Sequence, residues 1–316
     1  MNINKLIDRV DAIQQRHRIL AFPFAVIKKY GDDSGGYQAA LLTYYGFLSV
    51  FPLFLVLITV LQLWFDNNPT VQHEISQSIS HFFPMLGEQL QSNVQGISKS
   101  GWGLAIGLIL TFYGARGVAE AMSYCYNNIW QVPRTRRPGF PKNQLQSLII
   151  MLAMTVGFIA SVAVSSFSSS LGRAFWVKVV ANILGFMVIT GVLMFISRRA
   201  TARRVPLRYT WLGSCIAGII IQLLLTFGSL ILSNYLKGID NLYGTFAVVI
   251  GMLFWIYLIA QVVIYSVEVD SVRFLRLYPR AINIEKPTKA DEEAYEMYAK
   301  IENYSPRHKK DTRFKH

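Results

Sequence analysis

The sequence predicts an all-α protein, namely a polytopic six-helix transmembrane bundle with an extracytoplasmic amphipathic helical hairpin between spans 1 and 2. Of the 316 residues, 53% are hydrophobic and only 16% are charged, whereas soluble domains carry about 25% charged residues. The mean hydropathy is +0.34. Long segments lack charged residues, and roughly 20 apolar residues suffice for a helix to cross a hydrocarbon core of about 30 Å. These segments do not show the alternation of barrel strands.

Six segments qualify as spans, because backbone groups inside a bilayer must satisfy one another within a helix. The second span is interrupted by charge and is interpreted as one continuous helix. The spans belong to a membrane domain of residues 34–272 and cover about 41–65, 102–130, 143–167, 178–197, 209–233 and 243–270.

The distribution of positive charge predicts the orientation. Twenty-six of the 31 Lys and Arg residues flank the spans on one side and four on the other. Because cytoplasmic loops carry the excess of Lys and Arg, both termini are expected in the cytoplasm. The same excess explains the net charge of +13 and predicts membrane lipids as partners, with anionic headgroups at the cytoplasmic face. Nucleic acid is not an expected partner, and no cleavable signal peptide is visible.

Three segments lie outside the spans. Residues 1–33 form a cytoplasmic N-terminal amphipathic segment, in which residues 3–13 gather their apolar side chains on one face. That helix either lies in the membrane interface or packs on the bundle. Residues 66–101 are expected to form the outer hairpin. Residues 273–316 form a cytoplasmic basic tail, partly disordered, with a short helix capped by Thr288.

A stripe of polar side chains marks the second span. Arg116 lies at its midpoint, where an arginine costs about 2.5–3.5 kcal/mol on insertion scales. Glu120 follows one turn later and is placed to neutralise it in part. Steps of about 100° per residue set these side chains on the same helix face as two further polar residues. Together the stripe consists of Arg116, Glu120, Ser123 and Asn127.

Polar stripes also mark the last two spans. The sixth span carries Tyr257, Gln261, Tyr265 and Glu268 at helical spacing. The fifth carries Gln222, Thr226, Ser229 and Ser233. Such stripes face a bundle interior or a wet cavity, so we expect a polar cavity between spans 2, 5 and 6. The alternative is that the stripes only hold the helices together.

The first span supplies further candidates. Tyr44 and Tyr45 are expected to line the path through the bundle. Pro52 frees a backbone carbonyl within the helix, and the resulting kink is either a hinge or static.

The motifs of soluble catalysis are missing. The five histidines form no metal-ligand pattern, and no nucleotide-binding loop or nucleophile elbow occurs. We therefore expect no metal, no cofactor and no enzymatic activity. Any transport would draw on the proton gradient or on the gradient of the substrate.

Three segments resemble the YihY/BrkB family of bacterial inner-membrane proteins. They are AALLTYYGFLSVFPLFLVLI (39–58), FYGARGVAEAMSYCYNNIWQV (112–132) and LYGTFAVVIGMLFWIYLIAQVVIYSVEVDSV (242–272). The resemblance covers about residues 20–280 and departs from the family near the end of span 6, where Ser266-Val267-Glu268 replaces a frequent Gly-Ala-Glu. It implies a six-span protein of the bacterial cell inner (plasma) membrane. Members have been associated with virulence, serum resistance and export of lipids or lipid-linked saccharides, and some carry the label ribonuclease BN.

The leading hypothesis is a transporter or flippase-like protein for an amphiphilic anionic envelope molecule. Arg116 would bind its anionic group, Glu120 would hold Arg116 when the site is empty, and Asn127 would line the path with the tyrosines. Glu268 would act as a gate or proton-coupling group. The runner-up is a non-transporting scaffold whose basic loops and tail recruit partners. A membrane ribonuclease is less favoured, because the sequence lacks a His/Asp cluster. A second copy of the chain, in a homo-oligomer, is a further candidate partner.

Overall fold

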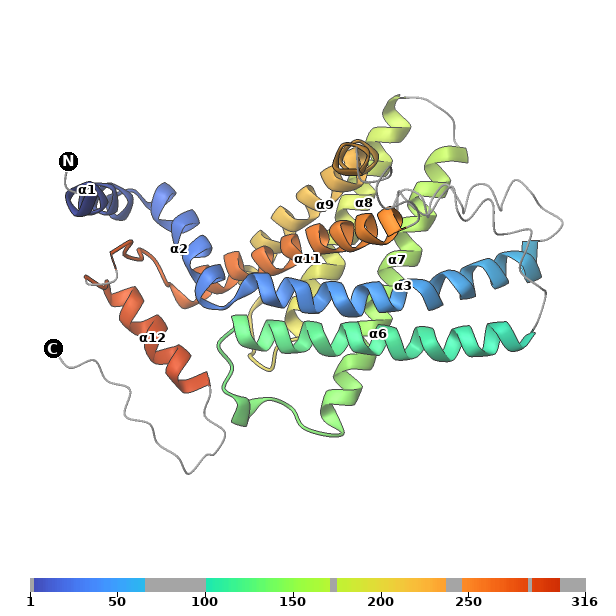
Figure 1. Ribbon diagram of the computed structural model, residues 1–316, viewed down its shortest axis with the longest axis horizontal. Helices are drawn as coiled ribbons and strands as arrows, with labels where there is room; N and C mark the ends of the chain where they lie inside the picture. Colours follow the sequence, from blue (N-terminus) through green and yellow to red (C-terminus); the bar gives the residue numbers. More distant parts are fainter. Residues whose placement is uncertain (1–2, 66–100, 171–174, 237–245, 284–285, 302–316) are drawn as a thin grey trace.

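The computed structural model describes residues 3–65, 101–170, 175–236, 246–283 and 286–301, and within them every regular element is a helix (Figure 1). The long helices are those that contain the predicted spans. The elements are α1 (Ile3–Arg16), α2 (Arg18–Asp32), α3 (Gly35–Phe65), α6 (Gly101–Ile129), η1 (Arg134–Arg136), α7 (Lys142–Ser170), α8 (Phe175–Arg199), α9 (Leu207–Leu236), α11 (Phe246–Leu275) and α12 (Lys289–Ile301).

Four of the described helices are long and apolar enough to cross a membrane. They contain the segments Lys142–Ser161, Val179–Arg199, Leu207–Gly228 and Phe246–Leu275, which correspond to the predicted spans 3 to 6. The first two expected spans lie in α3 and α6, which have 31 and 29 residues. That these two helices also cross the membrane stays a prediction. The expected outer hairpin at 66–101 lies outside the described residues, apart from Gly101 at the start of α6.

The long helices pack in a continuous order. Helix α6 lies along α3 and also contacts α7, while α11 packs between α3 and α9. Helix α8 packs against both α7 and α9. Figure 1 shows α3, α6 and α11 running in one general direction, with α7 crossing them steeply.

A glycine sets the closest approach between α9 and α11. A Cβ atom on Gly213 would collide with the carbonyl oxygen of Ser266 and lie 2.7 Å from the Asp270 carboxyl carbon. The Gly213 amide donates a hydrogen bond of 2.7 Å to Asp270 Oδ1. The small residue at this position therefore allows both the close packing and the hydrogen bond.

Helix α1 turns its polar side chains toward the protein. Asp11 and Gln14 are buried, Asp11 Oδ1 accepts a hydrogen bond of 3.1 Å from the Ile282 amide, and Gln14 donates to the Arg280 carbonyl. Val10 and Ile13 are 49% and 56% exposed. The helix thus packs on the protein through its polar side and leaves apolar residues outward.

The chain after α11 returns to α2 and then forms α12. The expected cap is present, since the Asp291 amide donates to Thr288 Oγ1 at 3.2 Å and the Thr288 amide donates to Asp291 Oδ2 at 3.0 Å. This reciprocal pair is a capping box with aspartate in the role of glutamate. Figure 1 shows α1, α2 and α12 gathered at one end of the bundle.

Candidate functional site

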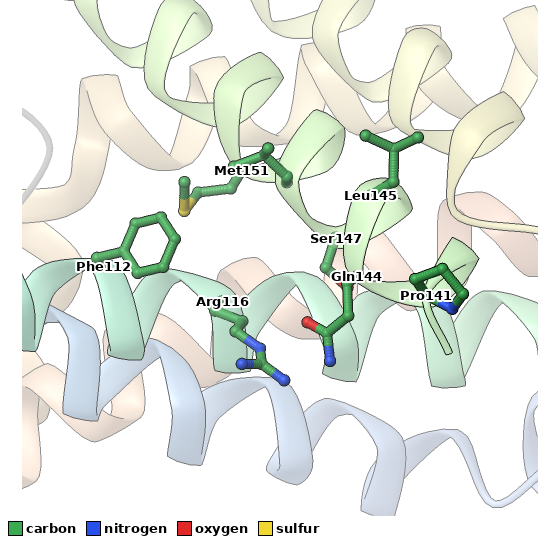
Figure 2. Close-up of a pocket in the computed structure, with 8 residues that line it drawn as sticks. Phe112, Arg116, Pro141, Gln144, Leu145, Ser147 and Met151 are labelled. Atoms are coloured by element: carbon green, nitrogen blue, oxygen red, sulfur yellow. The ribbon is translucent and has the colours of Figure 1, made fainter. Parts of the chain in front are cut away.

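A groove of about 400 Å³ opens between α6 and α7, and Arg116 is the charged residue in its lining (Figure 2). The walls are mostly apolar. They consist of Phe112 from α6, of Pro141 just before α7, and of Gln144, Leu145, Ser147, Leu148 and Met151 from the start of α7. Figure 2 shows Phe112 pointing toward Met151, and Gln144 reaching from α7 toward α6 on the side where Arg116 lies.

Arg116 pairs with Glu120 as expected, with 3.0 Å between Arg116 Nε and Glu120 Oε1. The two side chains are 41% and 38% exposed. The expectation that Arg116 faces a cavity enclosed by spans 2, 5 and 6 is therefore wrong. Arg116, at the middle of α6, instead lies beside the first three turns of α7.

Ser123 and Asn127 are separated from the groove. Both are buried, and Ser123 Oγ donates to the Ala200 carbonyl at 3.1 Å. Asn127 accepts from the Ala202 amide at 2.8 Å and donates to the Ala200 carbonyl at 3.2 Å. The loop after α8 covers this part of α6, so the predicted stripe is divided between an open groove and a buried loop anchor.

The candidates from α3 lie on the other side of α6. Tyr45 packs over Gly117, where a Cβ would lie 2.6 Å from the tyrosine ring. Tyr44 is 58% exposed, and its ring contacts that of Tyr45 at 5.2 Å between centroids. Neither tyrosine lines the α6–α7 groove. Helix α3 continues through Pro52, whose side chain is outside the described residues, so a hinge there stays a prediction.

The polar stripe of α11 faces α2 instead of a cavity with α6 and α9. The rings of Tyr265 and Tyr30 stack at 4.0 Å with an interplanar angle of 6°. Gln261 accepts a hydrogen bond from the Tyr30 hydroxyl and donates to the Tyr257 hydroxyl at 2.5 Å. The N-terminal segment is thus bound to span 6 by a continuous polar line. On α9, Gln222 donates to Asn182 of α8 at 2.8 Å, which supports a packing role for that stripe.

At the end of this line lies a buried charge cluster formed by Lys29, Asp33 and Glu268. Lys29 Nζ contacts Glu268 Oε2 at 2.8 Å and also the Asp33 carboxylate, and it donates to the Ile129 carbonyl at 2.9 Å. The side chains of Lys29 and Glu268 are fully buried, and that of Asp33 is 4% exposed. Gln131 donates to Asp33 Oδ1 at 2.8 Å. The cluster joins α2, α6 and α11.

The electrostatics of the cluster are dominated by burial. Burial alone would lower the pKa of Lys29, but the charges of Asp33 and Glu268 outweigh it and raise that pKa above its usual value. Burial raises the pKa of Asp33 more than Lys29 and Gln131 lower it. Glu268 Oε1 is buried with no hydrogen-bond partner among the described residues. Two carboxylates therefore share one ammonium group away from water.

A second ion cluster binds the tail to the opposite side of α2. Arg280 Nε lies 2.5 Å from Asp291 Oδ1, and Lys28 Nζ lies 2.9 Å from the same oxygen. Arg280 Nη2 lies 2.8 Å from Asp32 Oδ2. Burial alone would raise the pKa of Asp291, but hydrogen bonds from Lys28, the Ala281 amide and Arg280 hold that pKa below its usual range.

Sequence reasoning identified Glu268 but missed its partners. The signal was present, because Lys28 and Lys29 precede Asp32 and Asp33 by four residues each, which is the spacing of helical ion pairs. Lys29 pairs with Asp33 inside the bundle, whereas Lys28 and Asp32 bind Asp291 and Arg280 near α12.

A family model decides the classification of this chain, since the model described as virulence factor BrkB matches residues 26–289. The chain belongs to the virulence factor BrkB family. It is an integral membrane protein of that family, and the resemblance inferred from the sequence is confirmed.

The relatives of this BrkB-family protein are named only as membrane proteins. A UPF0761 membrane protein of Psychrobacter sp. (strain PRwf-1) is 26% identical over 81% of this chain and 49% of its own length. Two UPF0761 membrane proteins, of Vibrio campbellii and Vibrio vulnificus (strain YJ016), are 24% and 23% identical over 80% and 84% of this chain and 82% and 86% of theirs. The chain thus spans about half the length of the Psychrobacter relative. No solved structure matches.

The described residues of this BrkB-family protein bring together no group of three or more His, Cys, Asp or Glu side chains able to hold a metal ion. What they do offer is a half-open groove with one paired cation and a buried site with an excess of carboxylate. The first suits reversible binding of an anion, and the second suits a change of protonation.

Proposed function

We propose that this BrkB-family protein is a transporter or flippase-like protein for an amphiphilic anionic envelope molecule, such as a lipid or a lipid-linked saccharide. The observation that carries the proposal is the groove between α6 and α7. It is open to the side, its walls are mostly apolar, and its one cation is Arg116.

The groove has binding partners for both the anionic group and the apolar chain of such a molecule. The anionic group replaces Glu120 as the partner of Arg116, since a guanidinium binds phosphate or carboxylate through two parallel hydrogen bonds. An acyl chain lies along Phe112, Leu148 and Met151. Because Arg116 and Glu120 are both more than a third exposed, an incoming anion can reach the guanidinium without displacing packed side chains.

The buried charge cluster supplies the coupling in this proposal. Two carboxylates and one ammonium leave the site with an excess negative charge when all three are ionised, and one added proton removes that excess. Since Lys29 and Asp33 belong to the N-terminal segment and Glu268 to span 6, a change of protonation alters how firmly α2 is held on α11. The proton gradient is then the source of energy.

The test is transport in proteoliposomes loaded with a labelled anionic lipid. We expect Arg116→Gln to abolish translocation and Arg198→Gln, an exposed arginine at the end of α8, to retain it. Glu268→Gln should retain lipid binding but lose the dependence on an imposed pH gradient. Equal translocation by wild type and Arg116→Gln would remove the groove from the mechanism.

We further propose that the protein resides in the bacterial inner membrane with both termini in the cytoplasm. The position of α1 and α12 at one end of the bundle supports this (Figure 1), and so does the excess of Lys and Arg on that side. The outward Val10 and Ile13 suit contact with the interface, next to anionic headgroups. A reporter that works only in the cytoplasm should be active when fused to either terminus. A reporter that works only outside the cytoplasm should be inactive at both.

A scaffold that recruits partners through its tail is the alternative. Asp291 holds the first part of the tail to α2, so deleting that part of the tail would disturb the fold. Truncation after Ile301 is the cleaner experiment, because it leaves α12 in place. A transporter should keep its activity after this truncation, whereas a scaffold acting through the end of the tail should lose its phenotype. We propose no enzymatic activity, so the purified protein should not cleave RNA in the presence or absence of divalent metal ions.

A further inference from the structure

A second pocket, of about 420 Å³, lies at the end of the bundle that carries α12. Three segments far apart in the sequence line it: the loop after α6, the loop between α8 and α9, and the last turn of α12. Four of its lining residues are basic, namely Arg136, Arg203, Arg204 and Lys300, and no acidic residue is among those that line it. We call it the basic pocket.

The charges of this pocket are only partly compensated. Lys300 is bound by Glu296 at 3.1 Å. Arg203 is half-buried, and its pKa is lowered, first by burial and then by the positive charge of Arg136. Arginines are expected in these loops from the orientation of the protein alone. That rule does not require arginines from separate loops to meet around one hollow, where they repel one another.

One of these cations, Arg203, is held in place by the rest of the protein. Arg203 Nη1 donates to the Trp130 carbonyl at 3.1 Å, and its guanidinium lies 5.1 Å from the centre of the Phe274 ring. Asn127 binds the loop that carries Arg203 and Arg204 through the Ala202 amide. This gives the buried Asn127 a positioning role that the sequence alone did not reveal.

The loop after α6 is fixed as well. Arg137 donates to the Val132 carbonyl at 3.1 Å and to Asn128 Oδ1 at 2.7 Å. Gln131 lines the pocket and donates to Asp33 Oδ1 of the buried charge cluster. The loops that carry the arginines are therefore fixed, which lowers the entropy cost of assembling a site for an anion.

We propose that the basic pocket binds a phosphate group, carried either by a lipid headgroup or by a soluble molecule. Arg136, Arg203 and Arg204 provide the charge-assisted hydrogen bonds, and the bound anion relieves their mutual repulsion. The site is distinct from the α6–α7 groove, because the two pockets share no lining residue.

The test uses the full-length protein in nanodiscs, with two probes that separate the possible sources. Inorganic phosphate is titrated calorimetrically into protein in phosphatidylcholine nanodiscs at constant ionic strength. In the second arm, the unfolding temperature is compared between phosphatidylcholine and phosphatidylglycerol nanodiscs without added phosphate. Binding in the first arm indicates a soluble ligand, and stabilisation confined to the second indicates a lipid headgroup.

The variants decide whether either effect belongs to the pocket. Arg136→Gln with Arg203→Gln should weaken binding about tenfold or more, since each removes a hydrogen bond to a charged group. Arg198→Gln removes the same charge outside the pocket and should change nothing, and Arg116→Gln should leave this site intact. If the double variant does not fold, Arg136→Gln alone, at an exposed position on η1, carries the test. Equal weakening by Arg198→Gln, or no response to either probe, would overturn the proposal.

Discussion

The α6–α7 groove and the buried charge cluster both depend on a cation paired with a carboxylate, at nearly equal distances of 3.0 Å and 2.8 Å. Their surroundings differ. Arg116 and Glu120 are 41% and 38% exposed, whereas Lys29 and Glu268 are fully buried. An exposed pair contributes about 0–1 kcal/mol and exchanges partners readily, while a buried pair cannot lose one member without leaving an uncompensated charge. The same contact therefore suits ligand exchange in one place and control of the fold in the other.

The largest effect should come from Lys29→Met. This change leaves Asp33 and Glu268 buried without their shared cation, and the free energy of unfolding should fall by about 3–5 kcal/mol. Unfolding temperatures of purified protein in detergent measure the loss. Arg18→Met, at an exposed position of the same helix, should have little effect. Adding Glu268→Gln to Lys29→Met should recover part of the stability, and no recovery would argue against charge as the cause.

Asp291→Asn tests the ion cluster on the other side of α2. The loss of charged hydrogen bonds should lower the free energy of unfolding by about 2–3 kcal/mol. Because the pKa of Asp291 is lowered in the folded state, its contribution is present above the ordinary carboxyl pKa of 3.8 and is lost as the pH falls below it. Acid titration should therefore destabilise the wild type more than the variant below that pH. Parallel acid curves would contradict this role.

Two glycine substitutions test how firmly the tyrosine rings packed on them are held. A Cβ on Gly35 would lie 2.9 Å from Cγ of Tyr30, whose ring is held by Tyr265 and Gln261. Gly35→Ala should cost about 1–3 kcal/mol as an overpacked contact. Gly117→Ala should cost less, because the facing ring of Tyr45 packs edge-on against the exposed Tyr44 and can move, whereas stacking and a hydrogen bond hold the ring of Tyr30.

Gly191→Ala is the matched control for both glycine substitutions, since nothing lies within 4 Å of the added carbon. It should be neutral or stabilise α8 by up to about 1 kcal/mol. Thermal unfolding of the three variants ranks their losses of stability. A larger loss for Gly117→Ala than for Gly35→Ala would contradict this prediction.

Arg116→Gln should have the smallest effect on stability. Its pair with Glu120 is partly exposed, so the free energy of unfolding should change by less than about 1 kcal/mol. Glu120→Gln should behave alike. A loss of several kcal/mol in either variant would show that the pair is needed for folding, and it would leave the transport experiment unable to separate function from stability.

The predicted spans 3 to 6 agree closely with the observed helices. Segment 143–167 falls within α7 (Lys142–Ser170), and 209–233 falls within α9 (Leu207–Leu236). Uncharged segments of this length can satisfy their backbone only as helices in lipid, so little besides composition is needed. The Arg116–Glu120 pair was likewise predictable, because its two members are one turn apart on the same helix.

The candidate site was predicted only in part. Periodicity shows which residues share a face of a helix, but it does not show which segment packs against that face. The polar stripe of α11 is visible in the sequence, but it meets α2, whose Lys29 is 239 residues from Glu268. Ser123 and Asn127 share a face with Arg116, yet the loop after α8 covers only the two of them. Such contacts depend on which segments meet after folding.

Composition and the distribution of charged residues along the sequence thus determined the helical character, the apolar segments and the membrane class of this protein. The preference of a segment for water or lipid depends on that segment's own residues. The neighbours of each polar group were decided by packing. Helix α2 returns onto α11, and α12 returns onto α2, so residues from both ends of the chain bury charge together. The energy of a charge depends on everything within a few ångströms of it, and only the folded chain brings those atoms together.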